Sequence, residues 1–327
     1  MNPLLLDRRS FDAAELMRAH PPRFTHRNKR AVFSELLRPG EVPAGTVMMT
    51  RWSDAPLPDR RPARRPRVTE RVGLFEYGEA VAPGTMRWHV NFATSDCFAY
   101  YAGPLLAQDE LQVLEHPALG SLREAATAEG FSLLCVEGGR PTPVLVSGVE
   151  RRGQLDTAPA PGRPAGLYGN AFARAPEGAF LSALARIEPP TTTNLVAIEA
   201  PAYGSGDYRG EEIDLVLATA YAGFRAAVME TGRAALRTGA PARTIVHTGF
   251  WGAGAYGGDR ELMALLQLVA AELAEVDEVV FHSVHEEGSA TFAEARRKYE
   301  GLPGATTDEV VRSVLALGYR WGVSNGT

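Results

Sequence analysis

Apolar residues follow two alternating patterns along the chain from about residue 72 onward. Short apolar or β-branched runs predict buried strands at residues 88–93, 131–136, 144–146, 195–200, 244–247 and 278–284. Between them, apolar residues three or four positions apart predict amphipathic helices over residues 211–225 and 261–276. Strands that alternate with helices predict an α/β domain, in which helices cover both faces of a mixed, mostly parallel sheet.

The first 71 residues have a different pattern. Scattered apolar residues over 10–37 predict short helices, which Pro21 and Pro22 separate. Four prolines within residues 54–71 disfavour a helix or an inner strand and favour a solvated, extended connector. An arginine patch for phosphate is the alternative for that segment. We therefore expect residues 1–71 to form an accessory segment with an Arg/Pro-rich connector, and residues 72–327 to form the α/β domain.

Composition narrows the class of protein. The chain has 327 residues and a formal net charge of −5, which disfavours nucleic acid as a partner. Two cysteines, Cys97 and Cys135, exclude a disulfide scaffold and a cysteine-built zinc site. No apolar run approaches the roughly 20 residues of a membrane span, and the first residues lack signal-peptide features. We expect a cytoplasmic protein without a membrane partner, and the oligomeric state stays open.

A glycine-rich segment, residues 248–259, lies between a predicted strand and a predicted helix. Free backbone amides at such a place can bind an anion, so the segment is a candidate phosphate cradle. A tight strand-to-helix turn explains it equally well, because its spacing matches neither a Walker loop nor a dinucleotide fingerprint. Tyr256 in this segment either stacks on a sugar or base or packs internally. We expect Asp259 to cap the following helix and Trp251 to lie in the core.

Three polar residues, Gln108, Asp109 and Glu110, begin another predicted helix. Paired acids near a cavity can perform general acid–base catalysis. Acids are also favoured at a helix start by the helix dipole, and on spacing alone this second interpretation is preferred.

The histidines give no clear metal site. His282 and His285 precede Glu286 and Glu287, but this spacing differs from the two-histidine helical motif of zinc peptidases. We therefore predict no metal. A serine hydrolase is not indicated either, since no Gly-x-Ser-x-Gly segment lies between a predicted strand and a predicted helix, as a nucleophile elbow does.

Taken together, these segments resemble the catalytic domain of the poly(ADP-ribose) glycohydrolases, a divergent macrodomain. The most specific similarity is between residues 248–259 and the family's Thr-Gly-Asn-Trp-Gly-Cys-Gly-Ala-Phe-Gly-Gly-Asp. Further segments resemble family motifs in the same order, namely residues 90–94, 108–110, 116–119, 147–150, 167–172, 196–200 and 219–224. The resemblance covers residues 72–320 and implies a macrodomain-like sheet sandwiched by helices.

The resemblance also implies a site. Glu110 takes the place of the acid that protonates the ribose-linked leaving oxygen before water attacks, and Asp109 takes the place of the neighbouring acid that orients the substrate. No cofactor is implied. The ligand-binding positions implied by the same motifs are Phe75 and Glu76 at the adenine edge, Gln108 beside the acids, Tyr168 on the adenine, Gly252, Ala253, Gly254 and Ala255 at the phosphates, and Tyr256 as the stacking ring.

Departures from the family pattern are concentrated around the bond to be broken. The family's Gly-Gly-Gly falls at residues 98–100, where Phe98 and Tyr100 are expected to reshape the pocket beside the distal ribose. Thr94 and Phe250 replace two family asparagines. The adenine and phosphate half of the site is therefore kept, the other half is rebuilt, and processive removal of the polymer is disfavoured.

Three functions follow in order of preference. The first is a glycoside hydrolase whose partner is an ADP-ribose-containing small molecule, such as NAD or a derivative, or an ADP-ribosylated substrate. Glu110 is its general acid/base. The second is a catalytically inactive macrodomain that binds ADP-ribose or an NAD derivative. The third is a phosphodiester or pyrophosphate hydrolase that reuses the phosphate loop.

Overall fold

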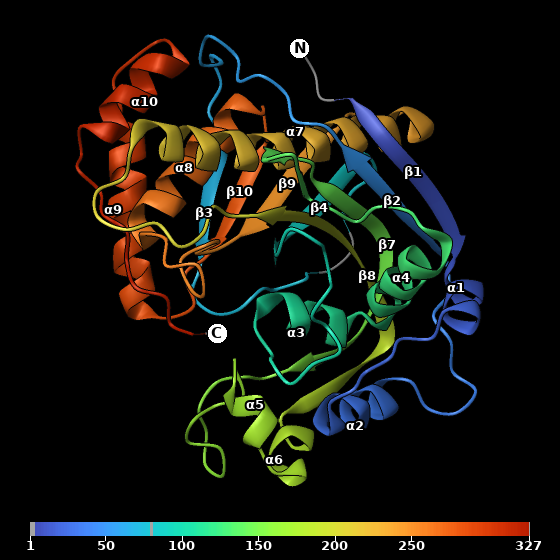
Figure 1. Ribbon diagram of the computed structural model, residues 1–327. Coiled ribbons are helices and arrows are strands. Elements are labelled where there is room, and N and C mark those ends of the chain that lie inside the picture. Colours follow the sequence, from blue (N-terminus) through green and yellow to red (C-terminus); the bar gives the residue numbers. More distant parts are fainter. Residues whose placement is uncertain (1–3, 79–80, 327) are drawn as a thin grey trace.

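An eight-stranded sheet forms the centre of the molecule (Figure 1). The computed structural model describes residues 4–78 and 81–326, and the strand order is β1-β2-β7-β8-β4-β9-β10-β3. In chain order the strands are β1 (Leu5–Asp12), β2 (Thr46–Trp52), β3 (Arg67–Arg71), β4 (Thr85–Ala93), β7 (Val144–Leu155), β8 (Leu184–Glu199), β9 (Arg243–Thr248) and β10 (Glu278–His282). Pairs from β1 to β8 are antiparallel and pairs from β8 to β3 are parallel, so the sheet is mixed.

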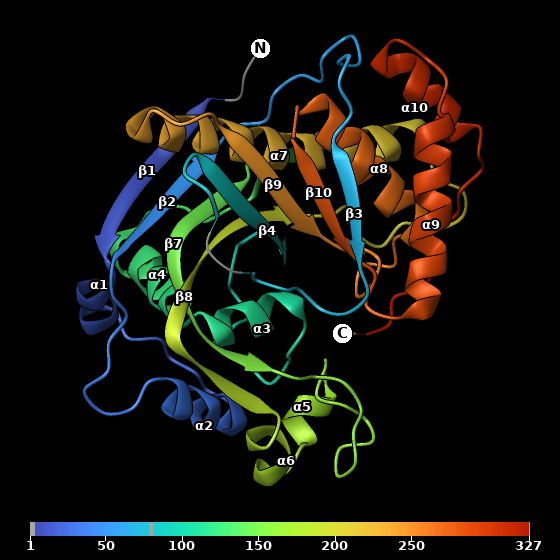
Figure 2. The ribbon, with the colours of Figure 1, turned by 180° about the vertical axis from the view of Figure 1, so that it is seen from behind.

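Helices cover both faces of this sheet, as Figures 1 and 2 show from opposite sides. On one face lie α7 (Gly210–Thr238) and α8 (Arg260–Leu273), with α9 (Glu286–Gly301) and α10 (Thr307–Leu315) beside them. On the other face lie α3 (Gln108–Glu115) and α4 (Pro117–Glu129), with α1 (Ala13–Ala19) and α2 (Arg27–Leu36) packed against them. The predicted α/β class, a mixed sheet sandwiched by helices, is confirmed.

Side chains alternate between two cores along the central strands. In β7, Leu145 packs into the core under α7 and α8, whereas Val144 and Val146 pack into the core under α3 and α4. A strand that is buried on both faces needs apolar residues at every position, which is why residues 144–146 form a continuous apolar run. The sheet therefore separates two hydrophobic cores, and the cavity described below opens at its edge.

Several predicted helices are confirmed, and one predicted strand is wrong. Helices α7 and α8 contain the predicted ranges 211–225 and most of 261–276, and Thr306 begins α10 with a capping box to Glu309. Residues 131–136, in contrast, form a buried loop that ends in the short β5 (Val136–Glu137), which pairs with β6 (Arg140–Pro141). The apolar run is buried, but its backbone bonds to residues 95–97 rather than to the main sheet.

The N-terminal segment contributes to the main sheet. Strands β1 and β2 extend it beside β7, and β3 pairs with β10 at the opposite edge. The Arg/Pro-rich connector is not simply solvated, because Arg61 forms a buried ion pair with Glu272 of α8. The division at residues 71 and 72 therefore does not coincide with a break in the sheet, and it stays a prediction about domain organisation.

The remaining helices lie below the sheet in Figure 1. These short helices are α5 (Ala171–Arg174) and α6 (Glu177–Leu181), and α6 contacts α2. Within residues 4–78 and 81–326, no helix combines the length and the hydropathy that crossing a bilayer requires.

Candidate active site

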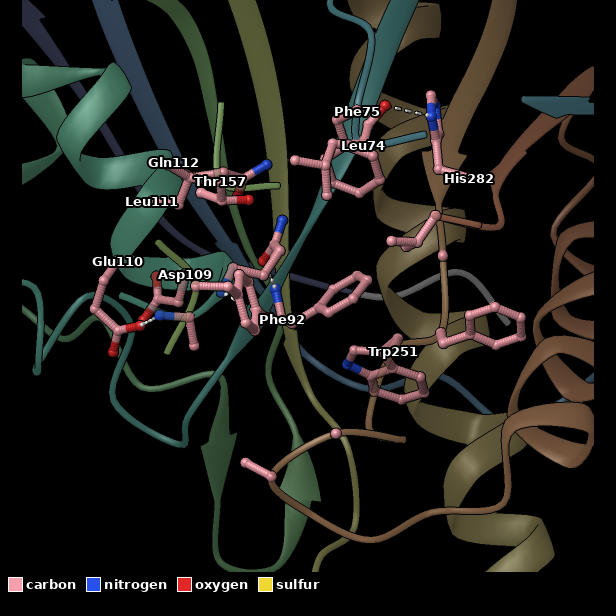
Figure 3. Close-up of a pocket in the computed structure, with 18 of the residues that line it drawn as sticks. Leu74, Phe75, Phe92, Asp109, Glu110, Leu111, Gln112, Thr157, Trp251 and His282 are labelled. Carbon is pink, nitrogen blue, oxygen red and sulfur yellow. Dashed lines mark hydrogen bonds between the residues drawn. The ribbon is translucent and has the colours of Figure 1, made fainter. Parts of the chain in front are cut away.

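A large cavity opens where five strands end. Its volume is about 1480 Å³, and its walls include residues that directly follow β3, β4, β8, β9 and β10. Ligand sites in open α/β sheets lie at the carboxyl ends of their strands. Figure 3 shows Asp109 and Glu110 at the start of α3, with Trp251 across the cavity and Leu74, Phe75 and His282 along another side.

The structure gathers almost all of the predicted site residues around this one cavity. The predicted residues that line it are Phe75, Glu76, Thr94, Tyr100, Gln108, Asp109, Glu110, Tyr168, Phe250, Gly252, Ala253, Gly254, Ala255 and Tyr256. Phe98 is the exception, because its side chain is fully buried in the core beneath α3 and α4. It therefore does not fill the ligand space as expected. Tyr100, two residues later, is exposed at the cavity and does take that place.

Asp109 is held by an amide network at the start of α3. Its Oδ1 accepts a hydrogen bond of 2.9 Å from Nδ2 of Asn91 on β4, while its Oδ2 is buried without a partner among the described residues. Burial, and next the neighbouring carboxylate of Glu110, raise the pKa of Asp109 to about 7. A carboxyl group with this pKa can hold a proton near neutrality.

Glu110 also caps its own helix. Its Oε2 accepts a hydrogen bond of 2.9 Å from the backbone amide of Ala107, which satisfies a donor that the start of a helix leaves free. Burial raises the pKa of Glu110, and the positive charge of Lys29 opposes that shift. The carboxyl group is thus nearly buried, oriented by its own backbone and placed at the cavity wall.

The side chain of Gln108 ties α3 to β4. Its Oε1 accepts a hydrogen bond from the amide of Phe92 at 2.8 Å, and its Nε2 donates one to the carbonyl of Val90 at 3.0 Å. These bonds hold the acids against the end of β4. They also engage both polar atoms of Gln108, so its contribution is the placement of the helix.

The glycine-rich loop between β9 and α8 has the form of an anion cradle. Gly252 has φ +74°, and a Cβ there would lie 2.4 Å from Cβ of Ala200, so only glycine fits. In the part of the chain that the structure describes, the amides of Gly254 and Ala255 donate no hydrogen bond and line the cavity. The predictions for Asp259 and Trp251 are confirmed: Asp259 accepts from the amide of Leu262 at 2.8 Å, and Trp251 is buried.

Tyr168 and Tyr256 both line the cavity, at different places. The hydroxyl of Tyr168 accepts a hydrogen bond of 3.1 Å from the amide of Gln108, so this ring lies at the start of α3, beside the acids. The hydroxyl of Tyr256 donates to Glu199 at 3.2 Å. Both rings are available to a ligand in the cavity. The assignment of Tyr168 to an adenine ring stays a prediction.

Histidines that the sequence analysis did not assign to the cavity hold the segment 74–76 in place. His282 lies 3.0 Å from the carbonyl of Leu74 and 3.0 Å from His247. Because a carbonyl only accepts, Nδ1 of neutral His282 carries the hydrogen, and its Nε2 accepts from His247. His89 stacks on His247 with ring centroids 4.4 Å apart and donates to the carbonyl of Glu76 at 3.4 Å. Phe75 packs on His282 at 5.0 Å.

Lys29 and Asn91 are the other residues that sequence reasoning missed. Asn91 lies in a segment that resembles a family motif, but nothing in the sequence showed its bond to Asp109. Lys29 belongs to the N-terminal segment. The only feature of the sequence that could have drawn attention to it is that lysine is rare, since it occurs only at positions 29 and 298. Among residues 4–78 and 81–326, no group of three or more His, Cys, Asp or Glu side chains is placed to hold a metal ion.

Fold and cavity together define an α/β protein with a large cleft at the ends of its strands. Residues 168–291 match the family model described as poly(ADP-ribose) glycohydrolase (PARG), macro domain fold. The resemblance stated from the sequence is thereby confirmed: the chain is related to the poly(ADP-ribose) glycohydrolases, and residues 168–291 carry the match. Asp109 and Glu110 precede the matched range.

Solved structures of this family are similar to the chain at low identity. One is a poly(ADP-ribose) glycohydrolase from Thermomonospora curvata bound to the inhibitor ADP-HPD, with 15% identity, 82% of this chain and 98% of that chain covered, and a TM-score of 0.44. Another is the enzyme from Deinococcus radiodurans in complex with ADP-ribose, with 15% identity, 90% of this chain and 95% of that chain covered, and a TM-score of 0.40.

Proposed function

We propose that the protein is a glycoside hydrolase that acts on an ADP-ribose-containing substrate, with Glu110 as its general acid/base. The substrate is an ADP-ribosyl conjugate or an NAD-like dinucleotide. The reaction protonates the oxygen or nitrogen that leaves the ribose, and water attacks the anomeric carbon. It requires no cofactor.

The observation that carries this proposal is the shared cavity of the acid pair and the glycine-rich loop. Gly254 and Ala255 present backbone amides suited to phosphate oxygens, and Asp109 and Glu110 stand on the opposite wall. An ADP-ribosyl group carries a diphosphate and a reactive anomeric carbon that are separated by only one ribose, so a single ligand can present both groups to the two walls. The family match over residues 168–291 supports the same substrate class.

Buried acids supply the proton that the reaction needs. A general acid works best when its pKa lies near the working pH, and burial is the usual way to raise a carboxyl pKa. Burial raises the pKa of both Asp109 and Glu110. Asp109 is buried and accepts a hydrogen bond from Asn91, so we assign it to orientation and proton storage.

A second function, binding without cleavage, is supported by two observations. The carboxylate of Glu110 already accepts a hydrogen bond from Ala107, so capping alone explains its presence. Tyr100 also stands exposed at the cavity where the family has a glycine. A ring there narrows the space in which water attacks.

Glu110→Gln separates the two functions. A glutamine keeps the acceptor for the Ala107 amide, so the helix start and the cavity are retained. We expect the substitution to abolish hydrolysis, by at least about a hundredfold, and to leave ADP-ribose affinity within a few-fold. Heat of binding is measured with ADP-ribose and with NAD. The same samples, together with a mono-ADP-ribosylated peptide and poly(ADP-ribose), are then analysed for products by mass spectrometry.

A control and the opposite outcomes complete this test. Glu129→Gln, at an exposed position of α4, changes the same chemical group away from the cavity and is expected to behave as the wild type. Tight binding of ADP-ribose without turnover of any substrate by the wild type would favour the binding function. Turnover that survives in Glu110→Gln would remove Glu110 from the mechanism.

A further inference from the structure

A lysine is buried on α2, which packs against the helix that carries the two acids. Lys29 of α2 has a relative exposure of 0%, which is unusual for a side chain that ends in a charge. Its Nζ donates a hydrogen bond of 2.7 Å to the carbonyl of Tyr101, in the loop that joins β4 to α3. Helix α2 also packs against α3. The lysine thus joins the N-terminal segment to the loop and helix that carry Asp109 and Glu110.

The three ionisable groups form a small buried charge cluster. Lys29 interacts electrostatically first with Glu110 and then with Asp109, and Asp109 and Glu110 also repel each other. One cation and two carboxyl groups are neutral together only when one carboxyl group is protonated. Burying net charge is costly, so the neutral arrangement, with one proton shared by the acids, is favoured.

We propose that Lys29 is a positioning residue of the active site, which holds the loop at Tyr101 and supplies the positive charge that keeps one proton, rather than two, on the pair Asp109 and Glu110. This inference rests on the proposed function for its catalytic consequence. Its electrostatic content does not depend on turnover. Without Lys29 the neutral state of the pair would carry a proton on each acid, and no carboxylate would remain to orient a substrate or activate water.

Burial and neighbouring acids act on Lys29 in opposite directions. Burial lowers the pKa of Lys29, the charges of Glu110 and Asp109 oppose that shift, and the resulting pKa is about 8. Lys29 is therefore mostly charged at neutral pH, and the two acids favour that charge. Other titratable groups near the cluster are the Cys97 thiol beside Asp109, the Tyr168 hydroxyl beside Glu110, and His26 on α2.

The scarcity of lysine makes a direct test possible. Because the chain has lysine only at positions 29 and 298, a protein labelled with ¹⁵N at Nζ gives two side-chain signals from its own sequence. Lys298 lies in an ion pair with Glu261, far along the chain from the cavity, and is the internal control. We expect the Nζ titration of Lys29 to move to lower pH by at least one unit in Glu110→Gln, and the Lys298 titration to stay in place.

The Nζ titration of Lys29 is also measured in Asp109→Asn, which tests the other acid of the cluster. We expect a smaller downward shift for Lys29, because Asp109 is the second of the two acids that act on it. An unchanged Lys29 titration in both variants would overturn the proposal and leave Lys29 as a structural link to Tyr101. Both variants retain the backbone-capping acceptors, so neither result depends on a large change in packing.

Lys29→Met tests the consequence for the acids. We expect the carboxyl signals of ¹³C-labelled Asp109 and Glu110 to titrate at least one pH unit higher, which is a tenfold change in proton affinity. If the protein hydrolyses its substrate, the alkaline limb of kcat/KM should move upward by a similar amount, since a general acid with a higher pKa stays protonated to higher pH. Lys298→Met is the matched control for both measurements.

The outcomes separate this inference from the proposed function. A carboxyl shift in Lys29→Met without any turnover by the wild type would support the charge balance and contradict the hydrolase. Turnover by the wild type, together with unshifted carboxyl groups in a folded Lys29→Met, would support the hydrolase and contradict the charge balance. If Lys29→Met does not fold, the Nζ titrations in Glu110→Gln and Asp109→Asn decide alone.

Discussion

Asp109 and Glu110 are adjacent in the chain but have different partners. Asp109 accepts a hydrogen bond from Asn91 on the sheet and leaves a second oxygen unpartnered among the described residues, whereas Glu110 accepts one from the backbone of its own helix start. Two acids whose surroundings differ in this way can take different roles in one reaction. The arrangement fits Glu110 as the group that transfers a proton and Asp109 as the group that stores one.

A stability prediction follows from the raised pKa of Asp109. In the folded protein this pKa is about 7, above the value of about 3.9 for an unfolded chain. The folded state therefore retains a proton that the unfolded state loses, and stability falls as pH rises from about 4 to 7. We expect Asp109→Asn to be more stable than the wild type at pH 8, by up to about 4 kcal/mol, because an amide does not ionise.

The measurement for Asp109→Asn is urea unfolding at pH 8 and at pH 4. The advantage of the variant should shrink at pH 4, where the wild-type carboxyl group is protonated in the folded state and about half protonated in the unfolded state. An advantage that is the same at both pH values would show that Asp109 is ionised in the folded protein, contrary to its surroundings.

At the residue scale, the sequence predicted those site residues that belong to a motif. It did not predict those whose contacts come from distant parts of the chain. Asp109 and Glu110 were selected because residues 108–110 resemble a family motif. Lys29 could not be selected, because its contact with Tyr101 joins residues 72 positions apart. Phe98 was misplaced for the same reason: its position in the chain suggested the cavity, while the fold turns its side chain into the core.

At the scale of elements, the lengths of the strands were the hardest to predict. The sequence predicted residues 144–146 and 195–200, while β7 runs over Val144–Leu155 and β8 over Leu184–Glu199. Polar residues continue both strands beyond the apolar runs. Arg151, for example, is buried in β7 because Glu115 pairs with it at 2.9 Å. Hydrophobic periodicity cannot reveal a strand whose buried charges are compensated by a partner elsewhere.

The Arg/Pro-rich connector is another element whose packing depends on charge. Arg61 donates to both carboxylate oxygens of Glu272 on α8, at 2.9 and 2.8 Å, and both side chains are nearly buried. Removing one partner of such a pair leaves an uncompensated buried charge. We expect Arg61→Met to lower the free energy of unfolding by about 3–5 kcal/mol, measured by urea unfolding at pH 7.

Two further variants test the origin of that loss. Arg61→Met combined with Glu272→Met removes both charges and should recover most of the stability, since apolar pairs of similar volume replace buried ion pairs well. Arg64→Ala is the surface control. Arg64 pairs with Asp277 at 2.9 Å, but its side chain is 76% exposed, so the loss should stay below about 1 kcal/mol. If the double variant does not recover this stability, the guanidinium of Arg61 stabilises the protein by its packing rather than by its ion pair with Glu272.

At the scale of the whole molecule, the cavity is where the parallel half of the sheet meets both helical layers. Strands β4, β9 and β10 bring His89, His247 and His282 into one row, and α3 approaches from the opposite side with the acids. The α3 and α4 layer carries the acids, and the α7 and α8 layer carries the helix that follows the glycine-rich loop. Substrate binding across this junction would therefore join the two hydrophobic cores that the sheet otherwise separates.

The histidine row makes the stability of the whole molecule depend on pH. Burial lowers the pKa of His89 to about 3, of His247 to about 2 and of His282 to about 4. Burial also lowers the pKa of His116, which is not part of the row, to about 3. The unfolded chain binds protons at these positions below about pH 6.5, while the folded protein does not. The contribution of these histidines to stability is therefore complete above pH 6.5 and is lost as pH falls, with a slope of up to about 1.4 kcal/mol per pH unit for each histidine. Asp109 contributes a slope of opposite sign between about pH 4 and 7. Urea unfolding at pH 7, 6, 5.5 and 5 measures this slope, and we expect His247→Gln to reduce it by about one proton. A slope that is the same in His247→Gln and in the wild type would mean that His247 is already charged in the folded state and that the row does not hold residues 74–76 as neutral imidazoles.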